Sequence, residues 1–311
     1  MVQAGSAPIG NDSGMAAINA LAESGDFGPE QPGGKMSDVS DTRAAYVEKL
    51  MEFLDISALR PMKVLVNAGN GAAGPTFDAI AEALQKAGAP LEFVRIHHEP
   101  DGSFPNGIPN PLLEENQPKT ADPVVEHGAD IGVAWDGDFD RCFFFDHEGG
   151  FVPGEYVVGL LAEAFLAKEP GEKIVHDPRI IWSTREVVAQ MGGEAIQSRC
   201  GHSHIKQVMR DTGAIYGGEM SAHHYFRDFM ACDSGMIPWL LMVELICRRG
   251  ESLKDILAER RAAYPSSGEV NFRVEDQKAV IDRIEAEYAP KAENRDETDG
   301  LSLDFGDWRF N

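Results

Sequence analysis

Apolar and polar residues alternate in blocks along the middle of the chain, and these blocks have the lengths of short strands and longer helices. The predicted elements, in order, are a helix at 41–54, a strand at 63–67, a helix at 75–88, a strand at 91–96, a short helix around Val124 and a strand at 130–135. Strands that alternate with helices favour right-handed βαβ units, and therefore a parallel sheet.

The same alternation returns between residues 151 and 266. The predicted elements are a helix at 154–168, a strand at 173–176, a helix at 184–191, a strand at 194–198, a helix around 205–210, a strand at 214–216 and helices at 235–248 and 253–263. In helix 235–248, Met236, Leu240, Val243 and Cys247 recur at helical spacing, which indicates a stripe that faces the core. The pattern predicts an α/β fold, with tandem α/β domains and mixed, largely parallel sheets.

The two ends of the chain differ from the middle in composition and in the pattern of predicted elements. Residues 1–40 are rich in Gly, Ser, Ala and Pro, with a short helical pattern near 15–22, and we expect a linker or tail there. From residue 267 a strand at 269–274, a helix at 277–288 and a strand at 301–305 are predicted. We therefore expect four parts: the tail 1–40, α/β domains at 41–150 and 151–266, and the start of an α+β C-terminal domain at 267–311.

Composition excludes several classes of protein. With 311 residues and 43% hydrophobic composition, the chain has the size and make-up of a globular protein of about two domains. The 28 basic and 51 acidic residues give a net charge of −23, which argues against nucleic acid or an anionic membrane as partner. No unbroken apolar run reaches the roughly 18 residues of a membrane span, and four scattered cysteines suggest reduced thiols, so we expect a cytoplasmic location.

Three carboxylates follow directly on the apolar run 131–135. Asp136, Asp138 and Asp140 alternate in the segment Asp-Gly-Asp-Phe-Asp-Arg, residues 136–141, here called the metal loop. Alternate side chains of an extended segment point the same way, so their oxygens can converge on one hard cation such as Mg²⁺, with Arg141 beside them for an anion. A calcium EF-hand is excluded, because its sixth position would be Arg141 instead of Gly.

Residues 68–74, here called the glycine turn, follow a predicted strand and precede a predicted helix. Gly69, Gly71 and Gly74 fit the dinucleotide pattern G-x-G-x-x-G. The next strand runs into His97 and His98, however, and lacks an acidic residue for the ribose. Tight packing of the strand against the helix is the better interpretation.

A second polar constellation follows the strand at 214–216. In residues 218–223, here called the sugar loop, Glu219, Ser221 and His223 alternate. A carboxylate, a hydroxyl and an imidazole on one side suit a polyol, because Glu accepts hydrogen bonds from hydroxyls and His moves protons near neutral pH.

The metal loop, the sugar loop and residues 67–74 together resemble the α-D-phosphohexomutases. Segments 104–111, 176–179 and 307–311 look like the bacterial phosphomannomutase branch. The resemblance covers about residues 40–311 and implies domains 2 and 3 of a four-domain isomerase. Such an enzyme interconverts mannose 6-phosphate and mannose 1-phosphate through a phosphoserine and a bisphosphorylated sugar.

The resemblance also implies roles for individual residues. Asp136, Asp138 and Asp140 would hold Mg²⁺, and Arg141, Arg179 and His223 would be catalytic. The substrate, a mannose or glucose phosphate, would be bound by Glu219, Ser221, His202 and Lys206. Arg179 stands where relatives often carry a catalytic Lys, and a guanidinium barely deprotonates, so charge stabilisation is the role expected of it.

Two family motifs are absent from this sequence, the serine loop Thr-Ala-Ser-His-Asn-Pro and the phosphate loop Arg-x-Ser-Asn-Thr-Glu-Pro. We therefore expect a fragment that is inactive alone. Two other hypotheses stay open: a non-catalytic sugar-phosphate or metal-binding module, and a haloacid-dehalogenase-like phosphatase with Asp136 as nucleophile and Asp138 as acid/base.

Overall fold

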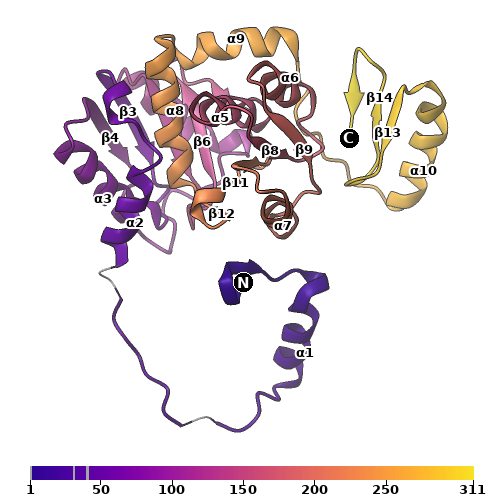
Figure 1. Cartoon of the computed structure of the whole chain (residues 1–311), viewed down its shortest axis with the longest axis horizontal. Coiled ribbons are helices and arrows are strands. Elements are labelled where there is room, and N and C mark those ends of the chain that lie inside the picture. The colour runs from indigo at the N-terminus through magenta and orange to yellow at the C-terminus, as the bar shows by residue number, and fades with distance from the viewer. Residues whose placement is uncertain (1, 31, 40–41) are drawn as a thin grey trace.

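Two α/β domains lie side by side and are followed by a small C-terminal module (Figure 1). The computed structural model describes residues 2–30, 32–39 and 42–311. Each α/β domain is built on one five-stranded sheet with both parallel and antiparallel neighbours. The predicted fold class is therefore confirmed.

The first domain places its strands in the order β4-β3-β5-β6-β7. β4, β3 and β5 are parallel, and β5, β6 and β7 are antiparallel. Its elements are α2 (Thr42–Met51), β3 (Met62–Asn67), α3 (Ala73–Lys86), β4 (Leu91–Ile96), α4 (Pro118–Glu126), β5 (Ile131–Trp135), β6 (Cys142–Asp146) and β7 (Phe151–Val152). Because the chain crosses from β4 over β3 to β5, the C-terminal ends of β3 and β5 flank a switch point, where α/β sheets bind ligands.

The second domain repeats this plan in the order β12-β11-β10-β8-β9. β10, β8 and β9 are parallel, and β10, β11 and β12 are antiparallel. Its elements are α5 (Gly154–Lys168), β8 (Lys173–His176), α6 (Trp182–Gln190), β9 (Glu194–Gln197), α7 (His202–Thr212), β10 (Tyr216–Gly218), β11 (His224–Phe226), β12 (Cys232–Asp233), α8 (Met236–Arg249) and α9 (Leu253–Ala263).

The mixed character of the predicted sheets comes from two strands that were not predicted individually, β6 and β11. β6 and β11 each join their sheet as an antiparallel neighbour of the preceding strand. They are connected by loops instead of helices, and an antiparallel pair needs no crossover helix. These two connecting loops are the metal loop and the sugar loop.

Helix α8 joins the two domains into one core. Every residue from Met236 to Cys247 is buried, so the helix is covered all round and not only along the predicted stripe. Trp239 lies 5.5 Å from Phe77 and 6.2 Å from Phe93 of the first domain, measured between ring centroids. α8 runs between the two domains (Figure 1), and one continuous cluster of buried side chains draws members from both.

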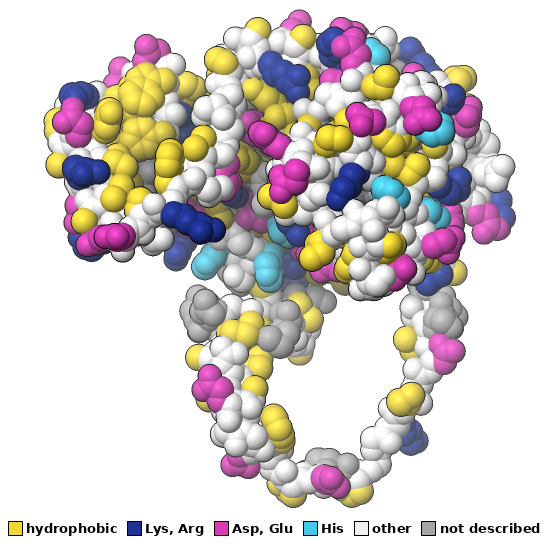
Figure 2. Space-filling view, turned by 180° about the vertical axis from the view of Figure 1, so that it is seen from behind, with side chains coloured by type: hydrophobic (Ala, Val, Ile, Leu, Met, Phe, Trp, Pro, Cys, Tyr) yellow, Lys and Arg dark blue, Asp and Glu magenta, His cyan; other side chains and the backbone are white. Residues whose placement is uncertain are grey.

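The C-terminal module contains α10 (Gln277–Tyr288) and an antiparallel sheet of β13 (Asn294–Asp296), β14 (Ser302–Asp304) and β15 (Arg309–Phe310). Figure 2 shows apolar side chains gathered on one face of this module. Trp308, which belongs to the module, is 46% exposed. The predicted strand at 269–274 is wrong. Phe272 there is 81% exposed, and the segment has no neighbouring strand among the described residues with which to pair.

The predicted tail carries more structure than its composition indicated. β1 (Val2–Gln3) and β2 (Ala7–Pro8) pair as a short hairpin, and α1 (Ala16–Ser24) follows. Pro8 is buried where β2 contacts α7. None of the helices in the described part of the chain combines the length and the apolar composition needed to cross a membrane.

Candidate active site

The metal loop turns the chain from β5 into β6. Its turn is closed by the Phe139 amide, which donates to the Asp136 carbonyl at 3.2 Å, and Phe139 adopts the left-handed conformation with φ 52°. Within this turn Asp136, Asp138 and Asp140 each offer a carboxylate oxygen, and these oxygens lie within 4.8 Å of one another. The structure therefore brings the three predicted metal ligands together.

The three carboxylates differ in their surroundings. Asp136 is buried, and Arg141 binds its Oδ2 through Nη2 at 2.5 Å and Nε at 2.7 Å. Burial raises the pKa of Asp136, although the charge of Arg141 opposes this effect. Asp138 is exposed. Asp140 has one buried oxygen, Oδ1, that accepts no hydrogen bond from the described residues, so an electron pair is left for a cation.

The sugar loop lies directly against the metal loop. Arg141 and His223 form an antiparallel backbone bridge, and the Cys142 amide donates to the Ala222 carbonyl at 3.4 Å. This contact joins the two domains at the C-terminal edges of their sheets. Side chains of the two loops consequently share one site.

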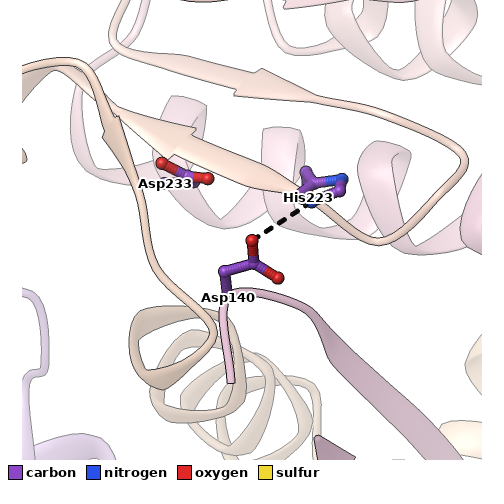
Figure 3. A group of neighbouring side chains, drawn as sticks. All are labelled: Asp140, His223 and Asp233. Atoms are coloured by element: carbon purple, nitrogen blue, oxygen red, sulfur yellow. Dashed lines mark ion pairs between the residues drawn. The ribbon is translucent and has the colours of Figure 1, made fainter. Parts of the chain in front are cut away.

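His223 stands at the centre of this junction (Figure 3). Its Nε2 forms an ion pair with Asp140 Oδ2 at 3.5 Å, and its Nδ1 lies 3.1 Å from the Ser221 hydroxyl. Burial lowers the pKa of His223, but the hydrogen bond to Asp140 and the negative charges of Asp140 and Glu219 together raise it above its usual value. The same contact lowers the pKa of Asp140. The pair therefore favours a charged imidazolium beside an ionised carboxylate.

Glu219 is more enclosed than its predicted role requires. Its Oε1 accepts the Gly201 amide at 2.5 Å, and its Oε2 accepts the Tyr225 hydroxyl at 2.7 Å. The side chain is only 4% exposed. Besides any contact with a sugar, Glu219 thus holds the segment before α7 against the sugar loop.

Lys206 and His202 project from α7. Lys206 is buried and pairs with Asp233 at 2.6 Å, beside the ring of Tyr225. Asp233 also lies near Asp140 and His223, as Figure 3 shows, so Lys206 balances part of the negative charge at this junction. His202 is exposed on the first turn of α7, and no described contact joins it to the other predicted site residues.

Arg179 is fixed in place by residues that the sequence analysis missed. Asp177 is fully buried and accepts Arg179 Nη2 and the Arg179 amide, both at 2.7 Å, as well as the Met220 amide at 2.9 Å. Arg309 of β15 donates to the carbonyls of Pro178, at 2.8 Å, and Arg179, at 3.3 Å. The position of Asp177 directly after strand β8 could have identified it as a site residue. Nothing in the sequence predicted that Arg309 would contact the backbone of Pro178 and Arg179.

A cavity of about 730 Å³ opens beside Arg179 and Ser221. Its lining comes from both domains and includes Asn110 and Leu113 of the first and Tyr156 and Arg261 of the second. A sugar phosphate fits a space of this size, since ligand pockets are typically about 300–1,000 Å³.

The glycine turn packs tightly against the metal loop. A Cβ at Gly71 would lie 2.5 Å from the Gly137 carbonyl oxygen, and the Ala72 amide donates to that oxygen at 3.0 Å. The Ala72 amide, directly before α3, is thus taken up by the protein's own backbone, in agreement with tight packing.

Comparisons with known proteins identify the family. Residues 44–150 match phosphoglucomutase/phosphomannomutase, alpha/beta/alpha domain II, and residues 153–264 match domain III of the same family. The phosphomannomutase of Salmonella montevideo is 54% identical over 313 residues, which cover 100% of this chain and 68% of that protein. The chain belongs to the phosphoglucomutase/phosphomannomutase family.

Solved structures agree with this assignment. A phosphoglucomutase/phosphomannomutase family protein from Burkholderia thailandensis has a TM-score of 0.78 at 27% identity, covering 98% of this chain and 63% of that one. N-acetylphosphoglucosamine mutase of Aspergillus fumigatus, solved with GlcNAc-6P and magnesium, shares the fold, with a TM-score of 0.51 at 15% identity, 85% of this chain and 64% of that one. The chain spans about two thirds of the length of these relatives.

Family membership confirms the predicted resemblance and the isomerase class. It also decides against the haloacid-dehalogenase-like phosphatase. The geometry agrees, because a nucleophilic Asp136 would have to face a substrate, whereas here both of its oxygens are bound by Arg141.

Proposed function

We propose that this chain carries the metal-binding and sugar-binding parts of a phosphomannomutase, which interconverts mannose 6-phosphate and mannose 1-phosphate. The observation that carries the proposal is the backbone bridge between Arg141 and His223, which places a predicted metal ligand 3.5 Å from a predicted proton carrier. The named relatives supply the substrate class.

Mg²⁺ is the cation proposed for the metal loop. Three closely spaced carboxylates suit a hard cation that prefers oxygen ligands, and Asp140 Oδ1, which accepts no hydrogen bond from the described residues, agrees with this choice. The magnesium in the Aspergillus structure supports it. When bound, the cation would neutralise charge on the transferring phosphoryl group.

The remaining residues would orient the sugar, transfer a proton and stabilise the charge of the phosphoryl group. His223, with Asp140 on one ring nitrogen and Ser221 near the other, can hold a proton at Nε2 and exchange it with a sugar hydroxyl. Burial lowers the pKa of Arg179, but the hydrogen bond and the charge of Asp177 act in the opposite direction and the pKa is raised, so we assign Arg179 to charge stabilisation and not to proton transfer. Glu219, Ser221, His202 and Lys206 would bind the hexose phosphate, or the sugar bisphosphate formed from it.

A mutase assay tests this function. The chain would be joined to the remaining segments of the Salmonella montevideo relative and supplied with mannose 1-phosphate, Mg²⁺ and a sugar bisphosphate. We expect mannose 6-phosphate to form, and formation to fall when His223 is changed to Asn. A folded protein that binds mannose 1-phosphate without converting it would favour the non-catalytic module instead.

A further inference from the structure

The metal loop is held between two glycines, one from each α/β domain. Gly71 contacts it from the first domain, where an added Cβ would lie 2.5 Å from the carbonyl oxygen of Gly137 and 3.0 Å from its Cα. Gly137 is the residue between Asp136 and Asp138, so this contact supports the peptide that links two of the three carboxylates.

Gly235 contacts the other side of the loop from the second domain. It lies at the start of α8, and a Cβ there would meet the carbonyl oxygen of Phe139 and lie 3.0 Å from that of Arg141. The Gly235 carbonyl also accepts the indole N–H of Trp135 at 2.8 Å. This second contact supports the peptide that precedes Asp140 and the peptide that joins Arg141 to Cys142.

Backbone conformation does not require glycine at either position. Gly235 has φ −81° and ψ −9°, which any residue adopts, and Gly71 is not among the glycines with positive φ. What excludes a side chain is the close approach of the metal loop. Because the nearest contacting atom at each position is a backbone oxygen of the metal loop, it cannot move aside without moving the loop.

We propose that Gly71 and Gly235 are positioning residues for the metal, which set the spacing of the three carboxylates by fixing the loop from both sides. The proposal rests on the metal binding proposed above. It makes the metal geometry depend on how the second domain packs against the first. Mg²⁺ demands near-ideal octahedral geometry whereas Ca²⁺ tolerates distortion, so a displaced loop should lose Mg²⁺ more than Ca²⁺.

Titration calorimetry with Mg²⁺ and with Ca²⁺ tests the proposal on the 311-residue chain and its Gly71→Ala and Gly235→Ala variants. Loss of support around metal ligands typically costs about ten- to a hundredfold in affinity, and we expect a loss of this size for Mg²⁺ and a smaller one for Ca²⁺. Gly102→Ala is the matched control, because nothing lies within 4 Å of a Cβ there. Folded variants with unchanged affinities for both ions would overturn the proposal.

Two further measurements test the positioning role if the alanine variants do not fold or if no metal binds. Trp135→Phe removes the hydrogen bond to Gly235 while keeping an aromatic ring, so it should weaken Mg²⁺ binding even if the alanine variants do not fold. Hydrogen exchange of the metal-loop amides without metal should be faster in each variant. If wild type binds no metal, the proposed metal function fails, and unchanged exchange in the variants would separately refute the positioning role.

Discussion

Asp138→Asn is expected to lower the affinity of the chain for Mg²⁺ by at least about tenfold, or about 1.4 kcal/mol. The substitution removes one of three negative charges that converge within 4.8 Å, and cation affinity depends strongly on the charge of the ligands. Because Asp138 is exposed, its loss should leave the melting temperature of the metal-free protein unchanged or slightly higher. Calorimetry measures the affinity, and a thermal melt measures the stability.

Asp122→Asn provides the matched control. Asp122 is also an exposed aspartate of the first domain, so the two substitutions change the net charge equally. We expect Asp122→Asn to leave Mg²⁺ affinity unchanged. Equal losses in the two variants would mean that the overall charge of −23, and not the metal loop, attracts the cation.

Trp239→Ala is expected to destabilise the whole molecule by about 3–5 kcal/mol. Trp239 is fully buried on α8 and packs against Phe77 and Phe93 of the first domain, so its removal leaves a cavity between both sheets. Because one core cluster includes both domains, they should lose stability together. Denaturant unfolding followed by a probe in each domain would measure this effect.

Trp308→Ala is the control with the same change of side chain. Trp308 is 46% exposed on the C-terminal module and stacks on Phe305, with ring centroids 4.2 Å apart. Trp308→Ala should change the free energy of unfolding of the two α/β domains only slightly. If Trp239→Ala melted only the second domain and left the first intact, the shared core would be contradicted.

The helices and the parallel strands of the two α/β domains were predictable, and their antiparallel strands were not. The apolar run 131–135 and the helix at 154–168 carry strong local patterns, and both occur as β5 and α5. β6 pairs with β5 through a tight loop, and hydrophobic periodicity does not report which strands are neighbours. The strand expected at 269–274 failed for the same reason, since alternation alone provides no partner.

In the candidate site, too, the contacts within one loop were predictable and the contacts between distant segments were not. Local spacing was enough to bring Asp136, Asp138 and Asp140 together, because they share one turn. The approach of His223 to Asp140 depends on two loops more than 80 residues apart in a chain of 311 residues. The support from Arg309, Gly71 and Gly235 is likewise tertiary, and nothing in the sequence predicted that these residues contact Arg179 or the metal loop.

Relaxation of mannose 1-phosphate by protein-bound Mn²⁺ tests most directly whether the two loops form one site. Mn²⁺ would replace Mg²⁺, and the relaxation rates of the sugar protons would be measured with wild type and with Asp138→Asn. We predict strong paramagnetic enhancement with wild type, because the metal loop and the sugar loop are bridged at Arg141 and His223, and its loss in the variant. Binding of both ligands to wild type without any enhancement would contradict a shared site.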